Sequence, residues 1–304
     1  MPSQKLGIFM FQCSQTKMSN IEHKKQLAFV LAKLGISNAT VAAQVEQFLL
    51  YCNHDRLVET VGWLGSERSK ASRRKPNQRN SFQKKILDQS KIWEIAKEKY
   101  NQHLRDYSFL YIAFNLLEDT LRRAIDLHYF SFYGEDWFKN KIYYPQSFST
   151  SPSAHKQKEL NKLLGCSSGH KFCSELTFGV ICEFVHDQKA WSVHNIEKFF
   201  EGKIDPENPK QLLPNLNICD VYERLEILRW RRNSIYHHNV MRKFYTIPSK
   251  YGCAFSQKGD GKFSNTRDRI YELLKYFGLK PKLVFSRVIG NSEQLLRNSS
   301  ISSS

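Results

Sequence analysis

One short stretch of this chain collects side chains that together can cleave RNA. An arginine pair, an amide and two imidazoles follow one another in Arg231-Arg232-Asn233-Ser234-Ile235-Tyr236-His237-His238-Asn239. An arginine can hold a phosphate through its fork of N–H donors. An imidazole that titrates near neutral pH can take the proton of a ribose 2′-hydroxyl without a metal. The stretch therefore indicates a metal-independent RNA-cleaving site that needs no cofactor.

The same combination of arginine and histidine occurs a second time, from Arg122 and Arg123 to His128. In a chain this rich in arginine and histidine, chance alone gives such a match, so spacing by itself decides little. The second match fits an amphipathic helix, and we assign its side chains to packing.

Helical geometry determines which side chains of the first stretch can meet. If a regular helix runs from Val221 at about 100° per residue, one stripe carries Val221, Leu225, Leu228, Arg232 and Ile235, and another carries Glu226, Trp230, Asn233 and His237. Arg232 then points partly into the core, where a half-buried guanidinium requires a carboxylate.

The second stripe raises a geometric problem for catalysis. Asn233 and His237 are four residues apart and can meet on one helix face, so the amide can orient the imidazole or contact phosphate. Arg232 and His237, in contrast, lie about 140° apart on an ideal helix. Either the helix distorts near Ile235, or a second copy of the chain completes the site.

The elements that position this stretch are expected to be helical almost throughout, which makes the fold class mainly α. Asp220 is a good N-cap for the helix that carries the motif, and the segment 246–262 fits a small hairpin or loop. The patterns predict an N-terminal helical accessory region (1–67), a basic linker (68–81), a main helical domain (82–297) and a frayed tail (298–304).

Within the accessory region, residues 34–41 resemble the turn of helix-turn-helix DNA-binding proteins. An ordinary helical hairpin explains the pattern as well, because the second helix is poor in lysine and arginine. Both interpretations stay open at this point.

The charge of the chain favours an anionic partner. A formal net charge of +17 raises the rate of encounter with polyanions, and phosphate contacts release counterions. No apolar run reaches the roughly 18 residues of a membrane span, and the first residues lack the features of a secretory signal. We therefore expect a cytoplasmic protein whose partner is RNA and not a membrane.

The seven cysteines are scattered and form no Cys-x-x-Cys pair, which favours reduced thiols. Cys166, His170, Cys173 and Cys182 are close enough in sequence to raise the question of a zinc site. Two of them, Cys173 and Cys182, flank an apolar run where small buried thiols are common. We expect no metal.

Four segments, in order along the chain, carry a resemblance to a known family. They are Tyr111–Arg122, with Glu118 and Arg122 four apart; Gly134–Phe138, with a Gly and a Trp; Leu176–Ile181, with a Phe-Gly pair; and Arg232-Asn233 followed by His237-His238. In this order they resemble the first helix, the Gly and Trp pair, the central helix start and the Arg–polar–His signature of the Abi-like (abortive infection) branch of the HEPN superfamily.

This resemblance implies a HEPN-like helical bundle that acts as a homodimer, with two copies of the motif paired about a two-fold axis. His237 would act as general base or acid on the 2′-hydroxyl and the leaving oxygen. Arg232 would stabilise the phosphorane charge and Asn233 would position the substrate, with a 2′,3′-cyclic phosphate as product. We expect Arg231 and His238 to contact substrate. Glu118, on the first helix that the resemblance defines, is the expected carboxylate partner of Arg232 and supports the site, with Asp119 and Glu226 as the next candidates.

The leading hypothesis is therefore an endoribonuclease of a bacterial abortive-infection or toxin-type system of antiviral (phage) defence, for which an antitoxin would be a further partner. Two alternatives remain. One is a catalytically inactive HEPN-like module that binds RNA or a partner protein, since many HEPN domains have lost activity. The other is a DNA-binding regulator that uses the N-terminal helix pair.

Overall fold

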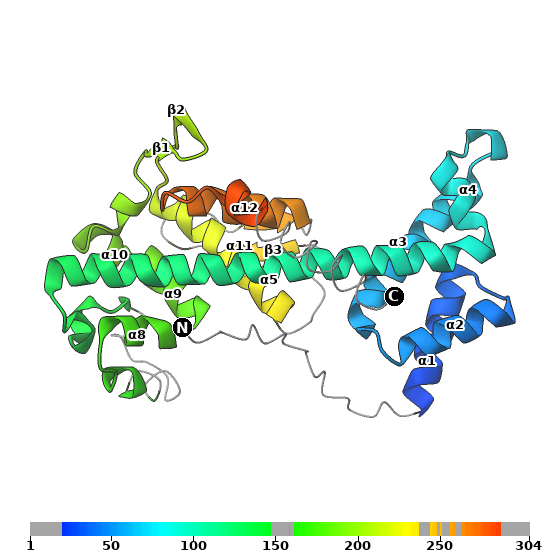
Figure 1. Ribbon diagram of the computed structural model, residues 1–304, viewed down its shortest axis with the longest axis horizontal. Coiled ribbons are helices and arrows are strands. Elements are labelled where there is room, and N and C mark those ends of the chain that lie inside the picture. Colours follow the sequence, from blue (N-terminus) through cyan, green and yellow to red (C-terminus); the bar gives the residue numbers. More distant parts are fainter. Residues whose placement is uncertain are drawn as a thin grey trace, which may run out of the picture. The chain divides into compact units, whose positions relative to one another are not determined.

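The fold is mainly α, as expected. The computed structural model describes residues 20–146, 158, 161–236, 244–247, 250, 256–259 and 263–286 (Figure 1). The chain forms two compact units, Met1–His103 and Leu104–Ser304. The boundary between them lies inside the 45-residue helix α5 (Gln89–Tyr133), so each unit contains one part of that helix. None of the described helices is long and apolar enough to cross a membrane.

The first unit contains α1 (Asn20–Leu34), α2 (Ala39–Leu49), α3 (His54–Arg73), a 3-10 turn (Pro76–Gln78), α4 (Ser81–Leu87) and the first part of α5. The turn expected between the first two helices is present. Gly35, with φ of 60°, ends α1, and the Asn38 side chain accepts a hydrogen bond from the Val41 N–H to start α2. The helix pair therefore forms as predicted, and α2 contains no lysine or arginine.

The predicted linker is wrong in its first part. Residues 68–73 continue α3, and the segment after residue 81 belongs to the first unit and not to the main domain. The reason is packing. Phe48 lies edge-on to Trp93 and Tyr100 of α5, with 5.3 Å between ring centroids in each pair, and the Asn53 N–H donates to the Tyr100 hydroxyl at 2.7 Å.

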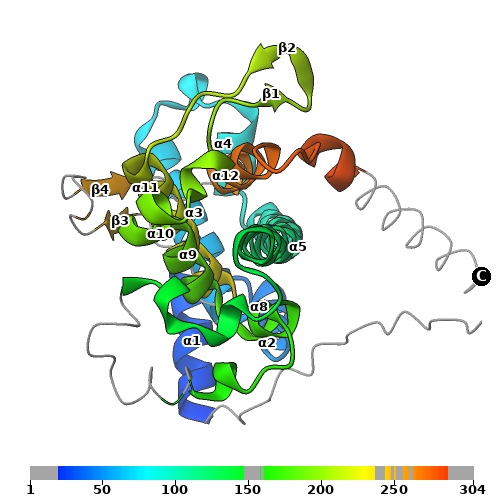
Figure 2. The same cartoon turned by 90° about the vertical axis from the view of Figure 1, so that its left-hand side faces the viewer.

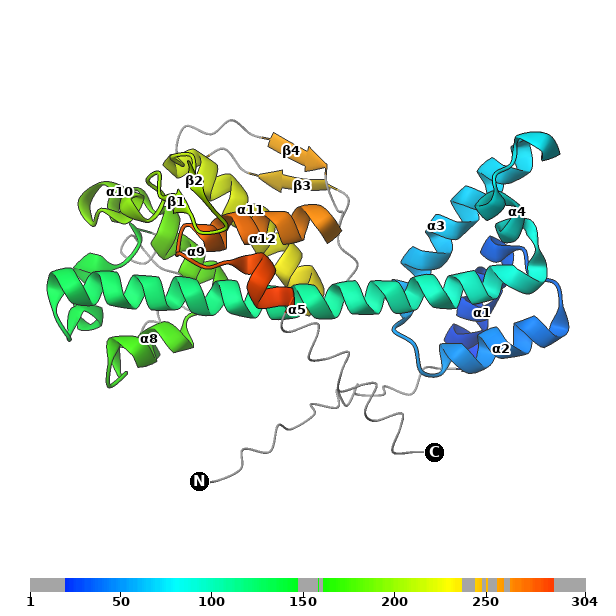
Figure 3. The ribbon, with the colours of Figure 1, turned by 45° about the horizontal axis from the view of Figure 1, so that its top comes forward.

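The second unit contains the rest of α5, two 3-10 turns (Trp137–Lys139 and Lys141–Tyr143), α8 (Gly169–Glu175), α9 (Phe178–His186), α10 (Gln188–Val193), a further 3-10 turn (Ile196–Phe199), α11 (Ile218–Tyr236) and α12 (Phe263–Lys275). The unit also contains two antiparallel hairpins. One pairs β1 (Ile204–Asp205) with β2 (Asn208–Leu212), and the other pairs β3 (Phe244–Ile247) with β4 (Ser256–Gly259) (Figure 3). The second hairpin is the one that the sequence allowed at 246–262. The tail predicted at 298–304 lies outside the described residues.

The core of the second unit is built around α5. Seen along this helix, α9 and α11 lie side by side next to it (Figure 2). The apolar stripe predicted for α11 is buried: Val221, Leu225 and Leu228 are fully inaccessible, and Ile235 is 2% exposed. These side chains belong to one apolar cluster with side chains of α5, α9 and α12. The cluster positions the polar face of α5 against α11.

The start of α11 differs from the prediction by one turn. Asn217, not Asp220, is the N-cap residue, because the helix begins at Ile218. The Asp220 N–H donates to the Asn217 side chain at 2.9 Å, and the Asp220 carboxylate accepts from the Asn217 N–H at 3.2 Å. This reciprocal pair is a capping box in which Asp220 takes the third helical position, where its charge also suits the helix dipole.

The Gly and Trp of the segment 134–138 have structural tasks. Gly134, with φ of 82°, ends α5 in a conformation that disfavours other residues. Trp137 is 1% exposed and stacks on Tyr129 at 4.8 Å, and its indole N–H donates to the Asp126 carboxylate at 3.3 Å. A methyl group at Gly169 would lie 2.4 Å from that carboxylate, so α8 can approach only because this residue is glycine.

Cys52, Cys166, Cys173 and Cys182 are free, as expected. Cys219 of α11 is disulfide-bonded, so the expectation of reduced thiols is wrong at this position. Spacing in a sequence cannot show which cysteine β-carbons come within bonding distance.

His186, the last residue of α9, is a buried titratable group. The ring is 2% exposed, and burial lowers its pKa to about 3, assisted by the positive charges of Lys250 and Arg229. The Glu226 carboxylate lies 3.9 Å from Nε2, but it already pairs with Arg229 at 2.6 Å, and burial outweighs its attraction. His186 is therefore neutral in the folded protein.

We expect the free energy of unfolding to fall as the pH drops below about 6.5, the pKa of an unfolded histidine. Between this value and the lowered pKa of His186, only the unfolded chain binds the proton, so acid favours unfolding. The loss from this residue is about 2 kcal/mol at about pH 5. Urea unfolding at about pH 7.5 and about pH 5 measures it.

His186→Gln should flatten this pH dependence, because the substitution removes the titrating ring. His170→Gln is the matched control, since His170 is exposed on α8 and its replacement should leave the slope unchanged. Equal slopes in the wild type and both variants would contradict the assignment.

Candidate functional site

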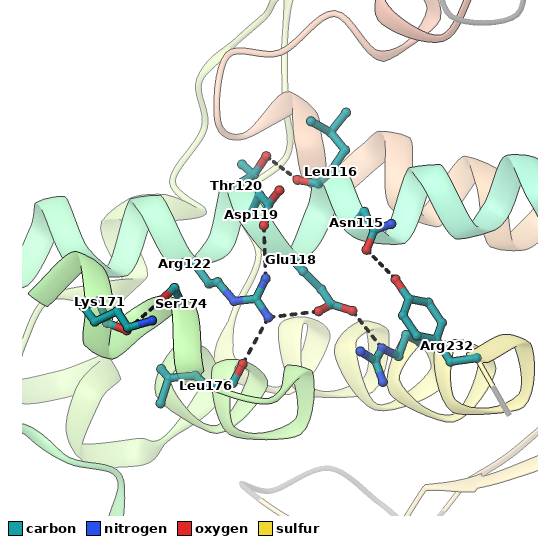
Figure 4. A network of polar contacts seen from close by, with 11 residues as sticks. Asn115, Leu116, Glu118, Asp119, Thr120, Arg122, Lys171, Ser174, Leu176 and Arg232 are labelled. Atoms are coloured by element: carbon teal, nitrogen blue, oxygen red, sulfur yellow. Dashed lines mark hydrogen bonds and ion pairs between the residues drawn. The ribbon is translucent and has the colours of Figure 1, made fainter. Parts of the chain in front are cut away.

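Four polar or aromatic side chains form a stripe on α5 that faces α11. Tyr111, Asn115, Glu118 and Arg122 are three or four residues apart and therefore share one face of the helix. Their opposite partners on α11 are Arg232 and Tyr236, which are also four residues apart. Figure 4 shows the contacts between the two helices.

The Glu118 carboxylate is the centre of this arrangement. Glu118 is only 3% exposed, and its two carboxylate oxygens accept hydrogen bonds from two guanidinium groups. Oε1 accepts from Arg232 Nε at 2.8 Å, and Oε2 accepts from Arg122 Nη2 at 3.1 Å. The ion pair predicted between Arg232 and Glu118 is confirmed. A carboxylate this deeply buried requires such partners, because charge in a low-dielectric interior is unstable without compensation.

Arg122 extends the network to a third helix. Its Nη2 also donates to the backbone carbonyl of Leu176 at 3.1 Å, immediately before α9, and its Nη1 donates to Asp119 at 3.1 Å (Figure 4). His128 of the second Arg–His match donates through Nε2 to the backbone carbonyl of His194. Both side chains thus bond within the fold, which agrees with a packing role for the second match.

Tyr236 was not predicted as a site residue, yet it holds Arg232 in place. Its hydroxyl donates to Asn115 Oδ1 at 2.6 Å, and its ring stacks on Tyr111 with 4.5 Å between centroids. The Arg232 guanidinium lies 3.8 Å from the centre of the Tyr236 ring, within cation–π distance. Burial raises the pKa of Tyr236, so its hydroxyl remains a donor. In the sequence, the spacing of four residues between Arg232 and Tyr236 was the signal that could have indicated this contact.

These contacts fix the plane of the Arg232 guanidinium and leave its outer edge unused. Nε is bound by Glu118, but within the described parts of the chain neither η nitrogen forms a hydrogen bond or an ion pair. The side chain is 22% exposed. An arginine held through Nε and one ring face presents its remaining N–H groups as a fork, which matches the oxygens of a phosphate or carboxylate.

The other predicted site residues lie in three different environments. Asn233 is exposed on α11. Arg231, expected to contact substrate, is 1% exposed and donates through Nη1 to the Thr266 hydroxyl of α12 at 2.7 Å, so in this conformation it cannot reach a substrate. The cause is α12, which covers the side of α11 from which Arg231 projects. His237 and His238 lie outside the described residues.

Asp119 and Glu226, the other two carboxylates considered as partners of Arg232, pair with other residues. Asp119 pairs with Arg122, and Glu226 accepts two hydrogen bonds from Arg229, at 3.2 and 2.6 Å. Glu226 is 6% exposed, so it is a buried carboxylate of α11 with its own arginine. Of the three candidates, only Glu118 reaches Arg232.

A zinc site was the open question about Cys166, His170, Cys173 and Cys182. Over the described ranges, no group of three or more His, Cys, Asp or Glu side chains is arranged to hold a metal ion. Cys173 and Cys182 are buried in the apolar core, and burial raises the pKa of both thiols. A raised pKa disfavours the thiolate form that metals bind.

We expect Glu118→Ala to lower the free energy of unfolding by about 3 to 5 kcal/mol, because it leaves two guanidinium groups without their carboxylate. Arg232→Ala should cost less, about 1 to 3 kcal/mol, since Glu118 keeps its bond to Arg122. Chemical denaturation measures both losses.

Asp119→Ala is the matched control. Asp119 neighbours Glu118 and pairs with the same Arg122 at 3.1 Å, but its side chain is 75% exposed. Such surface pairs contribute less than about 1 kcal/mol. If Glu118→Ala and Asp119→Ala unfold at the same denaturant concentration, the buried carboxylate does not organise this region.

Three of the four segments that resemble the Abi-like branch meet at Glu118. Glu118 and Arg122 come from the first, the Leu176 carbonyl from the third and Arg232 from the fourth. Phe114 and Phe178 of the first and third segments also contact each other, with 6.2 Å between ring centroids. No family model, no curated protein and no solved structure matches this chain.

Proposed function

We propose that this protein is a metal-independent endoribonuclease. The observation that carries the proposal is the Arg232 guanidinium, which Glu118 and Tyr236 orient while its η nitrogens carry no hydrogen bond within the described residues. Asn233 is exposed next to it, and His237 follows Tyr236 directly in the sequence. An imidazole can transfer the protons of metal-free RNA cleavage, an oriented cation can stabilise the charge that develops on phosphate, and an amide can position the substrate.

In the proposed reaction, the Arg232 fork binds the oxygens of the scissile phosphate. The imidazole of His237 removes the proton from the ribose 2′-hydroxyl, whose oxygen forms a bond to phosphorus. The bond from phosphorus to the 5′-oxygen breaks, and that oxygen takes up a proton from an imidazolium. The products are a 2′,3′-cyclic phosphate and a 5′-hydroxyl end. Arg232 stabilises the extra negative charge of the phosphorane.

Two further observations support RNA as the substrate and defence as the setting. The net charge of +17 suits a polyanion. The convergence of three Abi-like segments at Glu118 fits the bundle expected of that branch of the HEPN superfamily. On this proposal the protein acts in the cytoplasm as a homodimer, each copy contributing one motif, and an antitoxin holds it inactive until infection.

A second candidate function is a non-catalytic RNA-binding or partner-binding module. The observation in its favour is that Arg232 also serves the fold, through the buried carboxylate of Glu118 and the stack with Tyr236. A residue with that task is retained whether or not catalysis occurs. For the third candidate, a DNA-binding regulator, the absence of lysine and arginine from α2 removes the support.

We expect the purified protein to cleave single-stranded RNA in the presence of EDTA, because imidazole chemistry needs no metal. The fragments should end in 2′,3′-cyclic phosphate or 3′-phosphate, which mass spectrometry identifies. Cleavage that requires added magnesium, or fragments with 3′-hydroxyl ends, would refute the mechanism.

His237→Ala separates the enzyme from the binding module. If His237 moves the proton, cleavage and any arrest of growth on expression should collapse, while RNA affinity changes little, since the other cations remain. His170→Ala, an exposed histidine of α8, is the control and should retain full activity. Undiminished cleavage by the His237→Ala protein, with contaminating nuclease excluded, would mean that the active site lies elsewhere.

A further inference from the structure

The first unit carries a basic hairpin that the proposed active site does not use. Residues 68–87 include eight cationic side chains and no aspartate or glutamate: Arg68, Lys70, Arg73, Arg74, Lys75, Arg79, Lys84 and Lys85. They occupy the end of α3, the 3-10 turn and α4. Of these eight, six are exposed, all except Arg68 and Arg79. Such a dense block of one sign generates a strong positive potential.

The hairpin is a folded element and not the solvated linker that its composition suggested. The Arg79 guanidinium crosses the turn, and its Nε donates to the carbonyls of Ala71 and Arg74, at 3.0 Å each, which completes the C-terminus of α3. Asn80 and Gln83 form a capping box that starts α4. The exposed cations therefore project from fixed backbone positions.

Two exposed aromatic rings lie on the same hairpin. Trp63 of α3 is 43% exposed and Phe82 of α4 is 37% exposed, with 6.0 Å between their ring centroids. Lys99 of α5 places its Nζ 5.6 Å from the centre of the Trp63 ring. Large rings at the surface beside cations are the combination that proteins use to stack unpaired bases while binding the adjoining phosphates.

A groove lies between α1 and α3 of the same unit. It encloses about 430 Å³, and Gly62, Gly65 and Ser66 line it together with Lys33, Lys70 and Arg73. Gly65 lets α1 approach α3 closely at the groove, since a methyl group at this position would lie 2.9 Å from the Lys33 carbonyl. Lys70 is 63% exposed and pairs with the half-buried Glu67 at 2.7 Å, a surface contact that a phosphate can replace.

We propose that this basic–aromatic surface, made of Trp63, Phe82, Lys99 and the exposed cations of α3 and α4, binds single-stranded RNA. Bases stack on Trp63 and Phe82, and phosphates contact the lysines and arginines of the hairpin and the groove. A duplex does not fit this chemistry, because its bases are already stacked on one another and show no free face to a protein ring. The choice of RNA over single-stranded DNA rests on the proposed function, but the surface itself does not.

The test uses the full chain with the His237→Ala substitution, so that RNA stays intact. Fluorescence anisotropy with a labelled, unstructured RNA of about 20 nucleotides gives the dissociation constant at several salt concentrations. Trp63→Ala and Phe82→Ala should each weaken binding about ten-fold, from the loss of one stacked base. Lys84→Glu together with Lys85→Glu should weaken binding and reduce its dependence on salt.

Two controls separate binding from folding. Tyr51→Ala removes another ring of the first unit, 79% exposed, and should leave affinity unchanged. Trp63→Leu keeps an apolar contact to Phe82 without a ring for stacking, and should lose affinity at an unchanged melting temperature. Wild-type affinity in both Trp63 variants and in Phe82→Ala overturns the proposal, as does tighter binding to duplex DNA than to single-stranded RNA.

The two proposals fail in distinguishable ways. A chain that cleaves no RNA but binds it through Trp63 and Phe82 supports the surface and contradicts the endoribonuclease. A chain that cleaves RNA and whose affinity is indifferent to both rings supports the endoribonuclease and contradicts the surface.

Discussion

The second unit depends on one buried carboxylate. Glu118 of α5 is almost entirely buried, and its charge is stable there because Arg122 and Arg232 neutralise it. Through these two arginines it joins three helices, since Arg122 also holds the Leu176 carbonyl before α9 and Arg232 belongs to α11. Apolar packing brings α9 and α11 to α5, but it is not directional. The ion cluster selects one register among the arrangements that would bury a similar apolar area.

The same cluster sets what Arg232 can do. An arginine on a free surface has many rotamers, and ordering it on a phosphate costs side-chain entropy. Here Glu118 and the Tyr236 ring already restrict the rotamers of Arg232 in the folded protein, so its guanidinium is oriented before a ligand binds. This explains why a residue important for stability can also be suited to binding an anion. It also means that loss of activity on replacing Arg232 is not by itself evidence of catalysis.

The sequence predicted local features well and long-range ones poorly. Helical periodicity placed Arg232 at the edge of an apolar stripe, and the resemblance of residues 111–122 to a first helix then pointed to Glu118, 114 residues away. The prediction that Arg231 contacts substrate was wrong because α12 buries this side chain. The spacing of residues within α11 gives no information on where α12 packs. The prediction of a linker at 68–81 was wrong for a related reason. Composition shows the charge of this segment, but the hydrogen bonds from Arg79 that make it a hairpin depend on three-dimensional proximity. The contact between Tyr236 and Arg232 could be predicted from their spacing of four residues, but the hydrogen bond from Tyr236 to Asn115 could not.

One oriented arginine is a poor source of affinity for RNA. A single phosphate contact releases about one counterion, so it contributes little to binding at physiological salt. An enzyme whose active site offers little more than Arg232, Asn233 and an imidazole must therefore gain affinity from cations elsewhere. In the second unit many arginines are engaged with carboxylates, as with Arg122, Arg229 and Arg232. The exposed cations of α3 and α4, in a block that contains no aspartate or glutamate, offer such charge without cost to the fold. If both proposals hold, binding and chemistry would be supplied by different units, so that changes in the first unit would alter affinity and changes in the second would alter rate.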